Sequence, residues 1–274
     1  LSPAILNVPS NYFPTIQTAL DASNESDVVL VSDGVYYENL YFPAKNNIKL
    51  KSVNGAEYTT IDGSRNGSVI TVISYVIALD TTNSIEGFTI TNGGYIRDNS
   101  TTIYNRYGSG IYLQGGNSSG GANILIRNNI FKDNINSDSG GGGIYSFGSS
   151  PVIEQNIFEN NIAGISVNGD WGGNWYGGAI MAYYGNPKIR NCIFNGNQAI
   201  HSGGALRLYE TENILIENCV FNNNSLYIEP GYGFSPNSVG NTIDFYGDNV
   251  EFNFMNCIFT NSGDNPLDAQ YSNP

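Results

Sequence analysis

Basic residues are scarce in this sequence. Lys and Arg number 11 against 24 Asp and Glu, so the formal net charge is −13 and the pI is near 4.2. A nucleic-acid partner is therefore not expected, because contacts to phosphates need a basic face. An anionic polymer would also be repelled, unless a cation lay between it and the protein.

Long apolar runs and sustained helical periodicity are missing as well. No run approaches the ~18 consecutive apolar residues that suggest a transmembrane helix, so we expect no membrane span. Beyond the first tenth of the chain, no stretch keeps helical spacing for several turns. The chain begins at Leu1 without a leader-like segment, from which we expect a mature or excised fragment.

What the chain does contain is glycine, tyrosine and a repeat. With 33 Gly and 19 Tyr, the composition is that of a turn-rich all-β protein. Three consecutive copies of one unit read GGGIYSFGSSPVIEQNIFENN, GGAIMAYYGNPKIRNCIFNGN and GGALRLYETENILIENCVFNNN. Equivalent phenylalanines at 131, 158, 194, 221 and 259 are separated by 27, 36, 27 and 38 residues. A fixed period with insertions at one place in the unit predicts a solenoid.

The pattern inside the unit indicates which solenoid. Apolar residues alternate, a two-residue turn intervenes, and alternation resumes, as in the segment from Ile189 to Phe194. Three short strands in ~27 residues, with no helix to return the chain, predict a parallel β-helix. The turn column should adopt left-handed backbone geometry and bond along a stack of amides. Its members are Asn128, Gln155, Asn191, Asn218 and Asn256.

The next column is predicted to point inward. It contains Asn129, Asn156, Cys192, Cys219 and Cys257, so all three cysteines occupy one position of the unit in successive coils. This favours a stack of buried free thiols over a disulfide framework. We expect no metal there, because no histidine or further cysteine joins the column.

These motifs resemble known β-helix repeats. The Gly-Gly-Ala-Ile-like and Phe-x-x-Asn motifs are similar to those of bacterial surface proteins, including the chlamydial polymorphic outer-membrane proteins. The stretch TIQTALDAS…DVVLVSDGVYYENL resembles the entry segment of the pectate-lyase-like right-handed β-helix superfamily. The resemblance implies an all-β, single-stranded right-handed parallel β-helix. It implies no single function, because the superfamily holds lyases, hydrolases, esterases, adhesins and phage spikes. No motif matches the catalytic set of pectate lyases, polygalacturonases or pectin methylesterases.

We expect one domain spanning residues 1–274. Residues 1–27 form a lead-in and a short capping helix at 14–23, whose apolar face carries Ile16, Ala19 and Leu20. About seven coils occupy 28–262. The tail at 263–274 has no strong strand pattern and no clear cap, so the native protein is expected to continue. Insertions at 92–107, 162–176 and 225–239 emerge on one edge and are candidate binding loops.

Each unit opens with a glycine pair followed by a short apolar strand, which we call the glycine strand. The alternation of side chains along this strand predicts which of them face outward. Ile111, Ile144, Ile180, Leu206 and Ile243 should point in, and their successors Tyr112, Tyr145, Met181, Arg207 and Asp244 should point out. Two residues further, Phe147, Tyr183, Tyr209 and Tyr246 form an outward aromatic stripe, with Trp171 and Trp175 in a flanking insertion. Sugar rings could stack on this stripe, and Trp171, Trp175, Tyr145 and Tyr112 are further candidate substrate-binding residues. Alternatively, the stripe is a ladder that only stabilises the sheet.

Candidate catalytic groups lie around the same strand. They are Arg207, Asp244, His201, Glu210 and Asp170. Two carboxylates would suit glycoside hydrolysis, whereas an Arg or His base with Ca²⁺ neutralising a uronate would suit β-elimination. Arg207 and Asp244 could equally be a surface ion pair, and His201 a loop residue.

Two functional hypotheses remain open. The first is a secreted or cell-surface carbohydrate-active protein, a binding module, lyase or hydrolase, that holds a polysaccharide beside the glycine strand. The second is an adhesin-type structural solenoid without catalytic activity. The acidic, lysine-poor composition favours the outside of a cell for either hypothesis.

Overall fold

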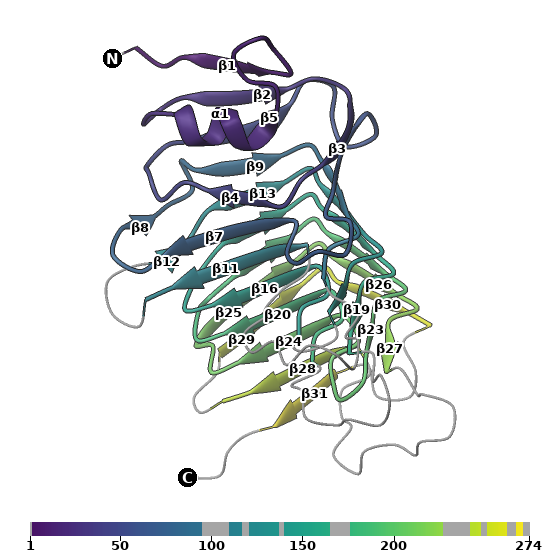
Figure 1. Cartoon of the computed structure of the whole chain (residues 1–274). Helices are drawn as coiled ribbons and strands as arrows, with labels where there is room; N and C mark the ends of the chain where they lie inside the picture. Colours follow the sequence, from purple (N-terminus) through teal and green to yellow (C-terminus); the bar gives the residue numbers. More distant parts are fainter. Residues whose placement is uncertain are drawn as a thin grey trace, which may run out of the picture.

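The protein is a parallel β-helix in which three faces are repeated coil after coil (Figure 1). The computed structural model describes residues 2–94, 110–116, 121–136, 140–164, 176–226, 242–247, 251–261 and 267–270. Every strand pair of the three main sheets is parallel and in register. The parallel β-helix predicted from the alternation within the repeat is confirmed. Each coil pairs only with the coils next to it, so equivalent residues of successive units become neighbours.

Three sheets build the walls, and their strands lie in the following spatial order. Sheet A runs β1 (Ile5–Val8), β2 (Val28–Val31), β5 (Lys49–Ser52), β9 (Ser84–Glu86), β13 (Leu125–Arg127), β17 (Val152–Glu154), β21 (Lys188–Arg190), β25 (Asn213–Glu217) and β29 (Glu251–Met255). Sheet B runs β3 (Gly34–Tyr37), β6 (Thr59–Asp62), β10 (Thr89–Thr91), β14 (Ile130–Lys132), β18 (Ile157–Glu159), β22 (Ile193–Asn195), β26 (Val220–Asn222) and β30 (Ile258–Thr260). Sheet C runs β4 (Leu40–Phe42), β7 (Ile70–Ser74), β11 (Ile111–Gly115), β16 (Ile144–Phe147), β20 (Ile180–Tyr183), β24 (Leu206–Tyr209), β28 (Ile243–Tyr246) and β31 (Leu267–Gln270).

Two-residue strands fill the corners between these walls. One small sheet consists of β15 (Ile135–Asn136), β19 (Ile162–Ala163), β23 (Gln198–Ala199) and β27 (Ser225–Leu226), and another pairs β8 (Ala78–Leu79) with β12 (Gly121–Ala122). The first of these adds a short fourth strand to several coils, beyond the three strands expected from the repeat. It lies between sheet B and the start of sheet C.

Both ends of the solenoid extend further than predicted. Residues 5–8 of the expected lead-in form β1, which pairs with β2, and residues 267–270 of the expected tail form β31, which pairs with β28. Within the described residues, sheets B and C thus have eight strands and sheet A has nine. Neither segment shows the repeat pattern in its sequence. Each forms a strand because it pairs with the exposed edge of the adjacent strand.

The N-terminal helix α1 (Ile16–Ala22) packs against β1, β2 and β4, as a cap over the first coil should (Figure 1). Ile16, Ala19 and Leu20 are fully buried on its inner face, as predicted. Thr15 and Thr18 form a capping box, and the Glu38 carboxylate accepts hydrogen bonds from the first two backbone N–H groups of the helix at 2.9 and 3.0 Å. No helix in the described part of the chain combines the length and the hydropathy needed to cross a membrane.

Stacked columns of identical side chains fill the core. Phe131, Phe158, Phe194 and Phe221 are fully buried, and successive rings, continuing to Phe259, stack at 4.7–4.9 Å within 7° of parallel. The predicted inward residues of sheet C, from Ile111 to Ile243, are all fully buried as well. Residues one repeat apart are therefore physical neighbours throughout the solenoid.

The turn column adopts left-handed geometry as predicted, but most of the amide bonding lies elsewhere. Asn128, Gln155, Asn191, Asn218 and Asn256 have φ between 51° and 56°. The continuous amide ladder is formed by the last residue of Phe-x-x-Asn: Asn134, Asn161, Asn197 and Asn224, each fully buried. The Nδ2 groups of Asn134, Asn161 and Asn197 each donate to the Oδ1 of the next coil's asparagine at 2.9 Å and to a backbone carbonyl at 2.9 Å. Asn224 ends the ladder and donates to the Phe194 carbonyl at 2.9 Å.

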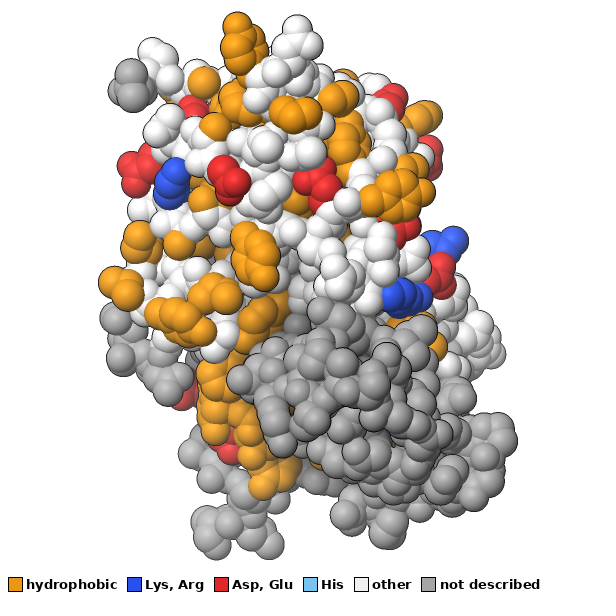
Figure 2. Space-filling model, viewed as in Figure 1, with side chains coloured by type: hydrophobic (Ala, Val, Ile, Leu, Met, Phe, Trp, Pro, Cys, Tyr) orange, Lys and Arg blue, Asp and Glu red, His pale blue; other side chains and the backbone are white. Residues whose placement is uncertain are grey.

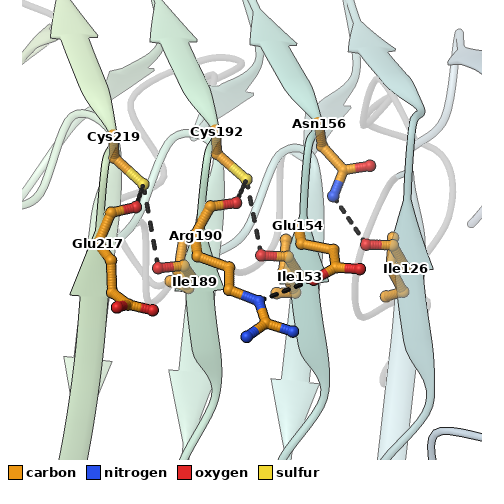
Figure 3. Close-up of polar contacts among 9 residues, drawn as sticks. All are labelled: Ile126, Ile153, Glu154, Asn156, Ile189, Arg190, Cys192, Glu217 and Cys219. Carbon is orange, nitrogen blue, oxygen red and sulfur yellow. Dashed lines mark hydrogen bonds and ion pairs between the residues drawn. The ribbon is translucent and has the colours of Figure 1, made fainter.

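The column after the turn changes from asparagine to cysteine without changing its role (Figure 3). Asn156 donates its amide to a carbonyl of the preceding coil, and the thiols of Cys192 and Cys219 point at the equivalent carbonyls. The acceptors are Ile126, Ile153 and Ile189, at 2.8, 3.6 and 3.9 Å. The three cysteines are free, as expected, and Cys192 and Cys219 are buried. A hydrogen bond with the Cys192 thiol, together with burial, raises the pKa of Cys219, so this thiol stays protonated.

Candidate functional site: an aromatic ladder on sheet C

Four aromatic side chains project from equivalent positions of β16, β20, β24 and β28. Phe147, Tyr183, Tyr209 and Tyr246 are in strict register, so the predicted alignment is present. Neighbouring rings stack at 5.7, 4.3 and 4.7 Å with interplanar angles of 10–13°. We call these four residues the aromatic ladder. All four are half-buried, and Figure 2 shows a continuous apolar band over this face.

The faces of the ladder rings are covered by the neighbouring rings of the stack. Tyr184, which follows the ladder residue Tyr183, is about half exposed and stands edge-on to Phe147, Tyr183 and Tyr209. A ligand on this surface therefore meets ring edges, phenol hydroxyls and the Tyr184 ring more than open ring faces. Burial, with hydrogen bonds from neighbouring phenols, raises the pKa of Tyr183, so its hydroxyl stays uncharged.

Sequence reasoning missed Tyr184 as a member of this surface. Its backbone is left-handed, with φ of 53°, at the point where β20 turns away from the sheet. That conformation places Tyr184 beside the ladder instead of one step along the strand. Tyrosine seldom adopts it, and continued strand alternation would place the residue on the inner face. The only available signal was the consecutive Tyr-Tyr pair at the end of the strand.

The second outward column is buried, contrary to expectation. Tyr112 and Tyr145 are only 8% and 6% exposed, and Met181 is 2% exposed. They form an apolar cluster outside the coil, against which Phe147, Tyr176 and Tyr183 pack. The backbone at Gly140 also lies directly against Met181 and Tyr176, leaving no room for a side chain there. Strand alternation correctly predicts that this column points out of the coil, but it cannot predict what folds back over the column.

Arg207 and Asp244 pair as predicted, but not at the surface. They are in register on β24 and β28, and the Arg207 guanidinium forms an ion pair with the Asp244 carboxylate. Asp244 is fully buried and Arg207 is 6% exposed, so the interpretation as a surface ion pair is wrong. The pair lies beside the ladder column, and three tyrosine rings lie against the guanidinium. They are Tyr176 at 4.8 Å, Tyr246 at 5.6 Å and Tyr209 at 5.7 Å.

The buried pair anchors the end of an insertion. Arg207 Nη1 donates to Ser202 Oγ at 3.2 Å, and Ser202 forms a parallel bridge with Tyr176, the last residue of the central insertion. Burial lowers the pKa of Arg207, and the surrounding tyrosines partly offset this effect. Such a pair, surrounded by rings, is suited to holding the insertion in place. It is poorly placed to exchange protons with a polymer at the surface.

The remaining catalytic candidates lie at opposite ends of β24. His201 precedes the strand with its ring 5.5 Å from that of Tyr176, and burial lowers its pKa. Glu210 follows Tyr209 at the other end, in a left-handed turn with φ of 51°. Residues 202–209 separate them in the chain, and the four residues of β24 alone span roughly 13 Å. Asp170, Trp171 and Trp175 lie outside the described residues. Of the predicted catalytic carboxylates, Asp244 is fully buried and Glu210 is half-buried, and the catalytic assignments stay predictions.

No group of three or more His, Cys, Asp or Glu side chains is suitably placed to hold a metal ion among the described residues. The calcium proposed for β-elimination therefore stays a prediction. If a cation takes part, ligands from outside the described ranges or from the substrate itself would have to complete its coordination.

Comparisons with known proteins address the fold. A family model described as "Right handed beta helix region" matches residues 44–273. No curated protein sequence matches the chain. Among solved structures, a pectin methylesterase in complex with a hexasaccharide is 13% identical over 98% of this chain and 80% of its own, with a TM-score of 0.44. Pectin methylesterase PemA from Erwinia chrysanthemi is 14% identical over 97% and 80%, with a TM-score of 0.43. The Aspergillus niger pectin methylesterase is 12% identical over 99% and 86%, with a TM-score of 0.36.

Proposed function

This chain belongs to the right-handed β-helix family, and we propose that it binds an extended polysaccharide along the aromatic ladder of sheet C, outside the cell. The observation that carries the proposal is the register of Phe147, Tyr183, Tyr209 and Tyr246, which repeats one aromatic edge per coil. A polymer of repeated units could contact such a surface several times. Weak contacts of each unit then add up along the chain.

The chemistry of the surface suits sugars. Carbohydrates have apolar C–H patches beside hydroxyl groups, and the ladder with Tyr184 offers apolar ring edges beside phenol hydroxyls. The half-buried state of the rings keeps them ordered, so little side-chain entropy is lost on binding. We propose binding without cleavage as the primary activity, because Arg207 and Asp244 are buried and Glu210 lies at the far end of β24 from His201.

A glycan array tests the proposal directly. The wild-type protein is expected to bind at least one class of polysaccharide, and Tyr183→Ala should weaken that binding at least tenfold. Tyr37→Ala is the matched control, because Tyr37 is a highly exposed tyrosine on sheet B. Reducing-sugar and ultraviolet assays for unsaturated products, with and without Ca²⁺, would reveal any hydrolysis or β-elimination of the bound polymer. Equal binding by both variants would refute the ladder as the site.

A structural surface solenoid is the second candidate. The observation favouring it is that the ladder rings stack face to face on one another, as expected if they serve chiefly to tie successive coils together. On this account Tyr183→Ala lowers the thermal midpoint of unfolding, and no glycan on the array is bound. Measuring both quantities on the same preparations separates the two functions.

A further inference from the structure

The described cations lie away from the aromatic ladder. In sheet A, six charged residues of alternating sign occupy one column across six strands: Lys51, Glu86, Arg127, Glu154, Arg190 and Glu217. Arg127 contacts Glu86 at 2.9 Å, and Arg190 contacts Glu154 at 2.7 Å. Because the signs alternate along the column, each cation of this set has a carboxylate on an adjacent strand.

The other described cations lie on sheets A and B or in the connections around the first strands, away from β16, β20, β24 and β28. They are Lys45, Lys49, Arg65, Lys132 and Lys188. Sheet C contributes Arg207 alone among the described residues, and its guanidinium is buried and paired with Asp244. An anionic group on a polymer at the ladder would thus lose hydration without gaining a cationic partner from this part of the chain.

Long-range electrostatics act in the same direction. The chain has a formal net charge of −13, so a polyanion is repelled as it approaches. The ladder hydroxyls do not offset this repulsion. They are neutral donors and acceptors, and the raised pKa of Tyr183 keeps that phenol protonated over the physiological range. Neutral hydroxyls and ring edges match the hydroxyls and C–H groups of uncharged sugars.

Resting on the proposed function, we infer that the ladder selects uncharged polysaccharides and rejects polyuronates and other polyanions. The selection comes from the absence of a free cation on the described part of sheet C, combined with the acidic charge of the whole chain. It is a preference about charge and not about one particular sugar. It should therefore hold across polymers with different backbones.

Affinity gel electrophoresis with matched polymer pairs tests this inference. One pair is hydroxyethyl cellulose and carboxymethyl cellulose; the other is fully methyl-esterified homogalacturonan and the same polymer after saponification. At low salt, the protein should be retarded at least tenfold more strongly by the uncharged member of a pair that it binds. The difference should shrink as salt is added, because repulsion is screened. Tyr209→Ala should lose the retardation, and Tyr37→Ala should keep it.

Introducing a cation at the end of the ladder column provides the sharper test. Ile73 of β7 lies in register with Gln114 of β11 at the N-terminal end of this column and is 36% exposed. Ile73→Lys should raise affinity for the charged member several-fold, whereas Ile73→Gln should not. Both variants should keep the wild-type thermal midpoint.

The outcomes separate the two claims. Equal or tighter binding of the charged member by the wild-type protein would overturn the inference and leave the proposed function standing. An unchanged preference in Ile73→Lys would show that charge is not the cause of selection. Absence of binding to all four polymers and to every glycan on the array would overturn the proposed function together with this inference.

Discussion

At the scale of single residues, asparagine has two different roles that depend on its column. In the turn column it supplies left-handed backbone geometry, and in the Phe-x-x-Asn column it supplies a buried amide ladder. The repeat predicted the first role correctly and assigned the amide stacking to the same column. The two roles could not be separated from spacing alone, because both columns recur with the same period and only burial distinguishes them.

Removing one side-chain amide from the buried amide ladder should lower the stability of the protein. Asn161 is fully buried and bonds to the carbonyl of Phe131 and to the asparagines of both neighbouring coils. Asn161→Ala leaves those partners unsatisfied, and we expect a loss of about 3 kcal/mol in the free energy of unfolding. Asn54→Ala, which removes an exposed amide bonded to Asp33, should cost well under that amount. Urea denaturation of both variants measures the difference in the free energy of unfolding, and equal losses would contradict a specific role for the buried amide ladder.

The buried ion pair between Arg207 and Asp244 should also contribute to stability in a way that single and double variants can reveal. Removing one partner, as in Arg207→Met or Asp244→Leu, should destabilise the protein by about 3–5 kcal/mol, because the other charge stays buried and unpaired. The double variant should recover most of this loss. A double-mutant cycle on thermal unfolding gives the coupling energy. If the effects of the two single variants simply add, the pair is not the buried unit described above.

At the scale of elements, the turn between sheets A and B recurs with left-handed geometry in every repeat of the central region. Gly87 occupies the same position in an earlier coil, with φ of 78°. Sequence reasoning anticipated this turn and the cap α1 because both depend on local residue preferences. It did not anticipate β1 and β31, because those strands form on the edges that neighbouring coils provide.

Asn191 allows the turn to be tested without disturbing packing, since its side chain is exposed. Asn191→Val should lower the free energy of unfolding by about 1–2 kcal/mol, because a β-branched residue is strained at a φ of 53°. Asn191→Gly is the matched control and should be close to neutral. Chemical denaturation of the two variants measures the strain. A valine variant as stable as the glycine variant would argue against a left-handed turn at this position.

At the scale of the whole molecule, strict registration of coils turns a sequence repeat into walls with distinct chemistry. Sheet A carries alternating charges, whereas sheet C carries the aromatic ladder beside the buried Arg207–Asp244 pair. The fold and the alignment of the four rings follow from period and alternation in the sequence. The burial of Tyr112, Tyr145, Arg207 and Asp244 does not, because strand alternation does not encode contacts made outside the coil, such as those of Tyr176.

Hydrogen–deuterium exchange with and without a bound uncharged polymer shows whether a polysaccharide lies across sheet C. We predict that protection increases in β16, β20, β24 and β28 and stays unchanged in the strands of sheets A and B. Protection confined to sheet A or B, or distributed equally over all three walls, would contradict binding across sheet C.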